Sequence, residues 1–185
     1  MSVSDPTAAT RPDAAPFIRD AEPTDYPAIR HVVIAAYAQY ARLIPADIFS
    51  PYLADLTDLE THARHGRLFV VEVDDQIRGF AAFHPDATVQ GVGFPPGWAS
   101  GRALAVHPSG RSHGVARALL ATGERLAREA GAPVFAFHTH SYMTGAFLCT
   151  RDSATAGRRS STSTWPPATA DSASSRSCRS PTSAT

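Results

Sequence analysis

Lysine is absent from this 185-residue chain, and all 17 of its basic residues are arginines. The absence of lysine excludes a P-loop, which needs a lysine directly after its last glycine. It also excludes any enzyme that forms a Schiff base through a lysine side chain. Because the formal net charge is zero, the chain as a whole offers no electrostatic attraction for nucleic acids or membrane surfaces.

Cysteine and long apolar segments are also scarce. Cys149 and Cys178 are the only cysteines, and their separation does not fit the Cys-x-x-Cys spacing of metal sites and redox motifs. The apolar runs are too short to span a bilayer, and no signal peptide is recognisable. We therefore expect a cytoplasmic protein without a disulfide framework or a metal site.

Apart from Trp165, large apolar residues are missing from one whole segment. Residues 149–185 contain no Leu, Ile, Val, Met, Phe or Tyr and are rich in Ser, Thr, Ala, Arg and Pro. Such a composition cannot bury enough apolar surface to offset chain entropy. The sequence thus predicts three parts, namely a disordered lead over 1–15, one domain over 16–148, and a disordered tail over 149–185.

Apolar periodicity in the central part predicts an α/β domain. We expect strands at 17–19, 68–73, 76–83, 98–106 and 134–138, with helices over about 22–40, 45–65 and 115–130. The second helix should break near Pro51, and Gly79 should mark a bulge or a close backbone approach. We expect solvated helix positions at His62, His65, Arg117, Glu124, Arg125 and Arg128. This order of elements predicts a mixed central sheet flanked by helices.

The most informative stretch runs from Leu104 to Leu120. An apolar strand is followed by a turn containing Gly110, Arg111 and Gly114, which opens into a helix. This layout points several backbone N–H groups and the positive end of a helix dipole at one place, which favours phosphate. Arg111 adds fixed charge and five donors. The glycine spacing does not fit a Rossmann turn, and an ordinary strand–helix connection with an incidental arginine stays open.

Two motifs in this stretch carry a family resemblance. Residues 111–116 fit Arg-x-x-Gly-x-Ala, and the preceding Leu-Ala-Val-His-Pro is similar to the strand before that loop in the GNAT superfamily of acyl-CoA-dependent N-acetyltransferases. The resemblance covers about Phe17 to Leu148. It implies the GNAT fold, in which two neighbouring strands separate and hold the pantetheine arm of acetyl-CoA between them.

The resemblance also implies a set of cofactor-binding residues. Leu104, Ala105 and Val106 match the strand that pairs with pantetheine through its backbone. The pyrophosphate loop and the start of the following helix are matched by Arg111, Ser112, His113, Gly114, Val115, Ala116 and Arg117.

The catalytic residues stay unassigned. The general acid of the family is commonly a tyrosine after a leucine, but here Cys149 follows Leu148. Some members carry a glutamate as general base on the strand before the loop, where this chain has Ser100. A water chain, His107, His138 or His140 could replace it. His138 and His140 share one strand face, but without a third ligand a metal-free role is favoured.

The anomalous tail suggests a change of reading frame near Ala146. One back-translation of the residues that follow, with a single G inserted after codon 146, reads AVPLYERLGYRRAPEFDLDV. That text resembles a GNAT C-terminal segment, including the missing Leu-Tyr-Glu. Without those final strands, the strand at 134–138 should expose an open edge that invites aggregation.

Three functions follow. The first is an N-acetyltransferase that moves an acetyl group from acetyl-CoA to an amine of a small molecule or peptide. The second is a CoA-binding module without catalysis, and the third is a defective product of a frameshifted gene. The resemblance also allows a homodimer.

Overall fold

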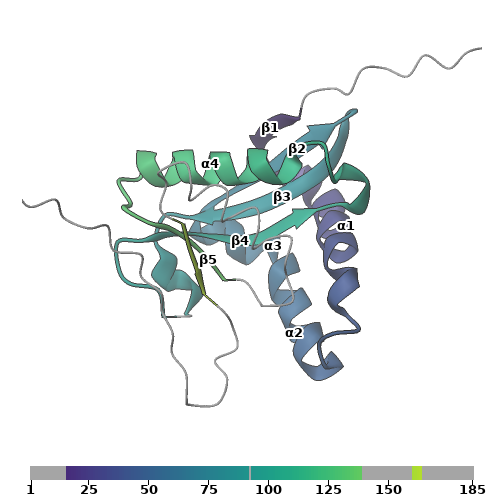
Figure 1. Ribbon diagram of the computed structural model, residues 1–185, viewed down its shortest axis with the longest axis horizontal. Helices are drawn as coiled ribbons and strands as arrows, with labels where there is room; N and C mark the ends of the chain where they lie inside the picture. Colours follow the sequence, from purple (N-terminus) through teal and green to yellow (C-terminus); the bar gives the residue numbers. More distant parts are fainter. Residues whose placement is uncertain (1–15, 92, 139–159, 164–185) are drawn as a thin grey trace, which may run out of the picture.

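Short apolar segments fold into a mixed sheet covered by helices on both faces (Figure 1). The computed structural model describes residues 16–91, 93–138 and 160–163. The helices of this part are α1 (Tyr26–Tyr37), α2 (Ala46–Thr57), α3 (Leu59–His65) and α4 (Val115–Glu129). Its strands are β1 (Phe17–Asp20), β2 (Arg67–Val73), β3 (Gln76–His84), β4 (Ala99–Val106), β5 (Phe135–His138) and β6 (Ser160–Ser163).

The strands lie in the sheet in the same order as in the chain, from β1 to β6. The pairs from β1 to β4 are antiparallel, whereas β5 runs parallel to β4 and to β6. The mixed α/β architecture expected from the sequence is therefore confirmed. Among the described residues, no helix is both long enough and apolar enough to cross a membrane.

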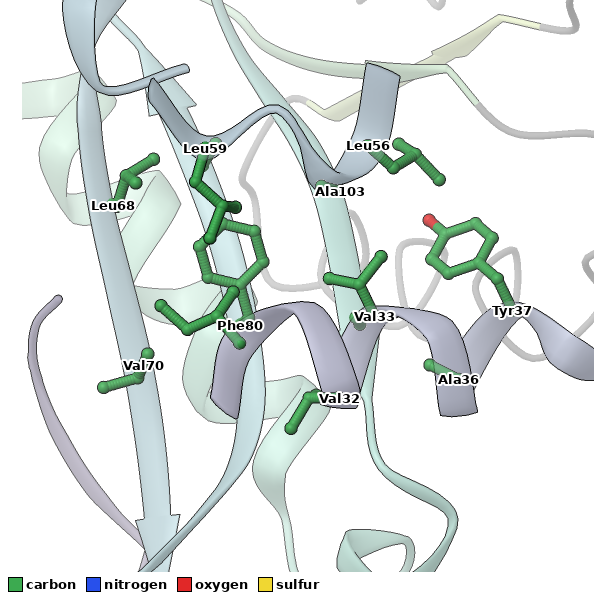
Figure 2. Close-up of a cluster of buried hydrophobic side chains, with 13 residues drawn as sticks. Val32, Val33, Ala36, Tyr37, Leu56, Leu59, Leu68, Val70, Phe80 and Ala103 are labelled. Atoms are coloured by element: carbon green, nitrogen blue, oxygen red, sulfur yellow. The ribbon is translucent and has the colours of Figure 1, made fainter. Parts of the chain in front are cut away.

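Two apolar cores separate the sheet from its helices. On one face, α4 places Val115, Leu119 and Leu126 against the sheet, as its periodicity predicts. On the other face, α1 to α3 cover the strands (Figure 1). Figure 2 shows this second core, where Val33, Leu59 and other helix residues meet Val70 and Phe80 of the sheet.

Gly79 has both roles that its position in a strand suggested. The β2–β3 register passes from Val71 opposite Gly79 to Glu72 opposite Ile77, so Arg78 is the extra residue of a β-bulge. A Cβ on Gly79 would lie 2.4 Å from Cγ1 of Val115. The missing side chain therefore lets the start of α4 pack directly on β3.

The second helical segment breaks at a different residue from the one expected. Pro51 lies inside α2, and the break falls at Asp58. The Asp58 side chain accepts a hydrogen bond from the Thr61 backbone N–H at 3.0 Å, which caps α3. An internal proline removes only one hydrogen bond of a helix. A capping aspartate allows a new helix to begin, so Asp58 and not Pro51 sets the boundary between α2 and α3.

Two helix residues expected at the surface are buried instead. Glu124 is 6% exposed within α4, and His62 is 6% exposed within α3. The His62 ring lies 5.5 Å from the ring of His84 and its Nε2 is 3.0 Å from the Asp55 carbonyl oxygen. Both helices pack against the sheet, and these two side chains lie on the covered side.

The expectation that β5 has an open edge is wrong. Residues 160–163 of the tail form β6 and pair in parallel with residues 135–138. Strand pairing needs only extended backbone with free N–H and C=O groups. A segment rich in Ser and Thr can therefore form the backbone hydrogen bonds along the edge of β5.

Candidate functional site

The centre of β4 carries a bulge. The β3–β4 register passes from Phe80 opposite Ala105 to Ala82 opposite Arg102, so two residues of β4 face one residue of β3. Within the bulge, Ala103 adopts a positive φ of 52°. The hydroxyl of Tyr37, which Figure 2 places beside β4, donates a hydrogen bond to the Leu104 carbonyl oxygen at 3.3 Å. The helix thus fixes the backbone of the bulge.

β4 and β5 are paired over only part of their length. The parallel register joins residues 99–101 of β4 to residues 135–137 of β5 and ends at Gly101 opposite Phe137. A Cβ on Gly101 would lie 2.1 Å from the Phe137 ring, so only glycine allows this approach. In the described part of the chain, residues 102–106 of β4 have no partner on the β5 side. The described part of β5 ends one residue after Phe137, at His138, so the described pairing of the two strands stops at Gly101.

The loop that follows β4 is held by β3. The His107 N–H donates to the Arg78 carbonyl oxygen at 2.8 Å, and Gly110 lies so close to Arg78 that a Cβ there would meet Arg78 Cβ at 2.8 Å. His113 Nδ1 lies 2.7 Å from the Arg111 carbonyl oxygen, which makes this ring nitrogen a donor. The path of the loop is therefore defined by its own backbone contacts.

The loop ends in an uncapped helix start. Ser112 and Gly114 adopt positive φ values of 68° and 74°. Gly114 is the N-cap of α4, makes no side-chain capping bond, and no acidic residue lies in the first turn. The first N–H groups of α4 and its dipole thus remain available for an anion. Arg111 and Arg117 are both exposed beside this place.

A polar cluster lies on the opposite face, toward α2. Arg102 forms an ion pair with Asp55 and lies over the Tyr52 ring at 5.7 Å. Sequence reasoning missed these residues. The available signal was the alternation of β4, where Ser100 and Arg102 place two polar groups on one face of an otherwise apolar strand.

The sequence-predicted cofactor residues come together at one end of the sheet. Leu104, Ala105 and Val106 end β4, residues 111–114 form the loop, and residues 115–117 form the first turn of α4. Of the histidines considered as bases, His107 begins the loop and His138 ends β5. His140 and Cys149 lie outside the described residues. In the part that is described, no group of three or more metal-ligating side chains occurs.

In this α/β sheet, β4 leads through a short loop into an uncapped helix start, a kind of place that suits an anionic group. The family model of the acetyltransferase (GNAT) family matches residues 29–146. The chain therefore belongs to the GNAT acetyltransferase family. No curated protein matches the chain.

Solved structures of acetyltransferases are similar to this chain. A GNAT acetyltransferase from Staphylococcus aureus Mu50 shares 13% identity with a TM-score of 0.58, over 75% of this chain and 81% of its own. The PaiA N-acetyltransferase from Thermoplasma acidophilum, crystallised with coenzyme A, shares 12% identity with a TM-score of 0.50, over 64% of this chain and 76% of its own. A GNAT acetyltransferase from Brucella melitensis, in complex with acetyl-CoA, shares 26% identity with a TM-score of 0.49, over 64% and 71% of the two chains.

Proposed function

We propose that this chain binds acetyl-CoA between β4 and the start of α4 and transfers its acetyl group to an amine of a small molecule or peptide. The single observation that carries this proposal is that β4 leads through a short loop into an uncapped helix start, with the exposed Arg111 and Arg117 beside it. An extended amide-containing arm and an anionic end would then meet complementary groups in the correct order along the chain.

The pyrophosphate would lie on residues 111–117. The N–H groups of Val115, Ala116 and Arg117 belong to the first turn of α4, where no acidic side chain competes with the ligand. Gly114 has open space around the position of a Cβ, so phosphate oxygens can approach the backbone. The exposed side chains of Arg111 and Arg117 would add charge-assisted hydrogen bonds.

The pantetheine arm would run along residues 104–106. Its amide groups can pair with a strand edge as an additional strand does, and the bulge at Ala103 fixes which main-chain groups of β4 point toward it. The hydrogen bond from Tyr37 to the Leu104 carbonyl oxygen holds this edge in place before the ligand arrives.

Acetyl-CoA supplies an activated thioester, so the amine nitrogen bonds to the acetyl carbon while the carbon–sulfur bond breaks and CoA leaves as a thiol. The protein has to accept a proton from the acceptor ammonium. His138 lies directly after Phe137, where the described β4–β5 pairing ends, whereas the Nδ1 of His107 is already bonded to Ser109 at the far end of β4. Position therefore favours His138 over His107 as the proton acceptor.

A CoA-binding module without catalysis is the second candidate. The replacement of the usual tyrosine by Cys149 in the sequence favours it. Calorimetry with CoA, together with a thiol-release assay over a panel of amines, separates the two. Binding with thiol release supports the transferase, and binding without release supports the module. The absence of CoA binding would overturn both.

A further inference from the structure

A second polar site lies beside the cofactor loop, in an open groove of about 550 Å³. The groove is formed by β1, the first half of α1, the β2–β3 turn and the residue that begins the loop. Its polar lining includes Arg19, His31, Asp75, Arg78 and His107. The lining contains none of the residues 104–106 or 111–117 assigned to acetyl-CoA.

One end of this groove is occupied by an ion-paired cluster of Arg19, Asp25 and Glu72. The Arg19 guanidinium donates to Asp25 and to Glu72, with N–O distances of 2.6 Å to each. These two carboxylates hold the pKa of Arg19 above its usual range, mainly through the Asp25 hydrogen bond and despite partial burial. Arg19 therefore has no donor to offer a ligand, and this end of the groove is structural.

The other end is cationic and lacks such partners. The guanidinium of Arg78 makes no hydrogen bond or ion pair within the described residues. The rings of His31 and His107 stack with their centroids 5.6 Å apart. His107 Nδ1 accepts a hydrogen bond from the Ser109 N–H at 3.2 Å, which leaves its Nε2 as the N–H donor.

A bulge in the backbone of β3, and not a hydrogen bond of the side chain, places Arg78 at this end of the groove. Arg78 is the bulged residue of β3, and a bulge redirects the side chain that it carries. Its main chain accepts the His107 N–H, so Arg78 and His107 are held together by the same contact. Three carboxylates line the groove: Asp25 and Glu72 bind Arg19, and Asp75 lies at the tip of the β2–β3 turn.

We propose that Arg78, His31 and His107 bind a phosphate group in this groove. A guanidinium and two imidazole N–H groups are the donors that phosphate oxygens accept. The local field supports this assignment, because burial first, and then the charges of Arg78, His31 and Arg111, lower the pKa of His107. A bound anion would relieve that repulsion and raise the pKa of the ring.

The phosphate group has two sources. It can be a separate phosphate-bearing molecule, or the 3′-phosphate of the coenzyme that the adjacent loop binds. In either case a bound phosphate would affect the conformation of the loop. Gly110 packs on Arg78 Cβ, and Ser109 contacts the His107 ring. The second source rests on the proposed function, whereas the first does not.

The test is an NMR titration of the full chain labelled at histidine ring carbons, at constant ionic strength. Inorganic phosphate, CoA and dephospho-CoA, which lacks the 3′-phosphate, are added separately. We expect phosphate to shift the His31 and His107 signals saturably and to raise the pKa of His107. Arg78→Gln should weaken this binding about tenfold or more, whereas Arg128→Gln, an exposed arginine of α4, should leave it unchanged.

Asp75→Asn gives a second readout that leaves Arg78 in place. Removal of the opposing carboxylate should tighten phosphate binding. If CoA shifts both histidines and dephospho-CoA does not, the source is the coenzyme itself. If neither phosphate nor CoA shifts them, or if Arg78→Gln and Asp75→Asn both leave the shifts unchanged, the site is refuted. Binding of dephospho-CoA reports on the cofactor loop alone and so tests the proposed function separately.

Discussion

The Tyr37 hydroxyl donates a hydrogen bond to the carbonyl oxygen of Leu104, 3.3 Å away, and so joins α1 to the bulge of β4. The side chain is 8% exposed, and burial is the main reason why the pKa of the phenol lies well above its usual value. The phenol therefore stays protonated and donates throughout the physiological range. The buried Tyr37 hydroxyl of α1 thus fixes the main chain of β4 at Leu104.

Tyr37→Phe should weaken the hold on the β4 main chain at Leu104 without creating a cavity in the core. The loss of one buried hydrogen bond costs about 1 kcal/mol of unfolding free energy, and we expect a higher KM for acetyl-CoA with a smaller change in kcat. Tyr26→Phe is the matched control, because the Tyr26 hydroxyl makes no hydrogen bond in the described residues. Equal effects of the two variants on acetyl-CoA binding would contradict a role of Tyr37 in the cofactor edge.

Arg111→Ala together with Gly114→Asp should abolish CoA binding and leave the fold intact. The double variant removes an exposed cation and places a carboxylate where the pyrophosphate would lie. The positive φ of Gly114 adds about 1 kcal/mol of local strain for a residue with a Cβ. Calorimetry measures the binding and circular dichroism the fold. An unchanged affinity for CoA would refute the loop assignment, and Arg128→Ala should bind CoA normally.

Gly101→Ala should push β5 away from β4. The new methyl group would overlap the Phe137 ring, and overpacking of this kind costs about 1–3 kcal/mol. Chemical denaturation of Gly101→Ala, Phe137→Leu and the double variant gives the coupling between the two positions. We expect Phe137→Leu to rescue part of the loss, because it removes the ring that the methyl group meets. Purely additive effects would show that the two residues do not touch.

Acid should destabilise the protein through His84. This side chain is 2% exposed, neither ring nitrogen has a hydrogen-bond partner in the described residues, and burial is the main cause that lowers its pKa to about 4. Since the unfolded chain binds the proton at an ordinary pKa of about 6.5, stability is retained above that pH. It falls as the pH drops from about 6.5 toward 4, by about 2 kcal/mol at pH 5.

Thermal unfolding between pH 7.5 and 4.5 measures this effect. His84→Leu has a similar volume and no titratable group, so its stability should depend less on pH in the same window. The exposed His65 provides the control, and His65→Leu should retain the pH dependence of the original chain. A wild-type curve that is flat from pH 6.5 to 5 would contradict the prediction.

A chain with the alternative reading after Ala146 should be the better enzyme. We expect a protein that carries AVPLYERLGYRRAPEFDLDV from residue 146 to melt at a higher temperature, because that text supplies apolar residues for further strands. It should also release thiol from acetyl-CoA faster, because it restores the Leu-Tyr-Glu of the family. Sequencing the coding DNA across codons 144 to 152 is the complementary check, and a sequence incompatible with the alternative reading would refute the frameshift.

The sequence predicted those parts of the fold that depend on local patterns. The strand at 68–73 and its partner at 76–83 are short apolar runs on either side of a turn, and the Asp74–Asp75 turn between them adopts the positive φ values of a tight hairpin. The glycine turn before α4 was equally recognisable. In each case a few neighbouring residues determine the backbone, so one sequence is enough.

Features that depend on tertiary neighbours were not predictable. His62 of α3 is buried because its ring lies against His84, the last residue of β3. The strand β2 and most of β3 separate the two residues in the sequence. The ion pair of Arg102 with Asp55 joins β4 to α2 across 47 positions. The stacking of His31 on His107 likewise joins two segments that no local pattern connects. Periodicity gives the face on which a residue lies, but not which element covers that face.

The order of the sheet has a consequence for how the protein is made. Because β1 to β6 are added in chain order, every strand finds its neighbour already synthesised, and the sheet can grow from one edge as the chain leaves the ribosome. β4 and the loop that follows it are complete before the ribosome reaches residue 146. A change of reading there alters only the last edge to be added, so the earlier part of the sheet can assemble in the same way from either message.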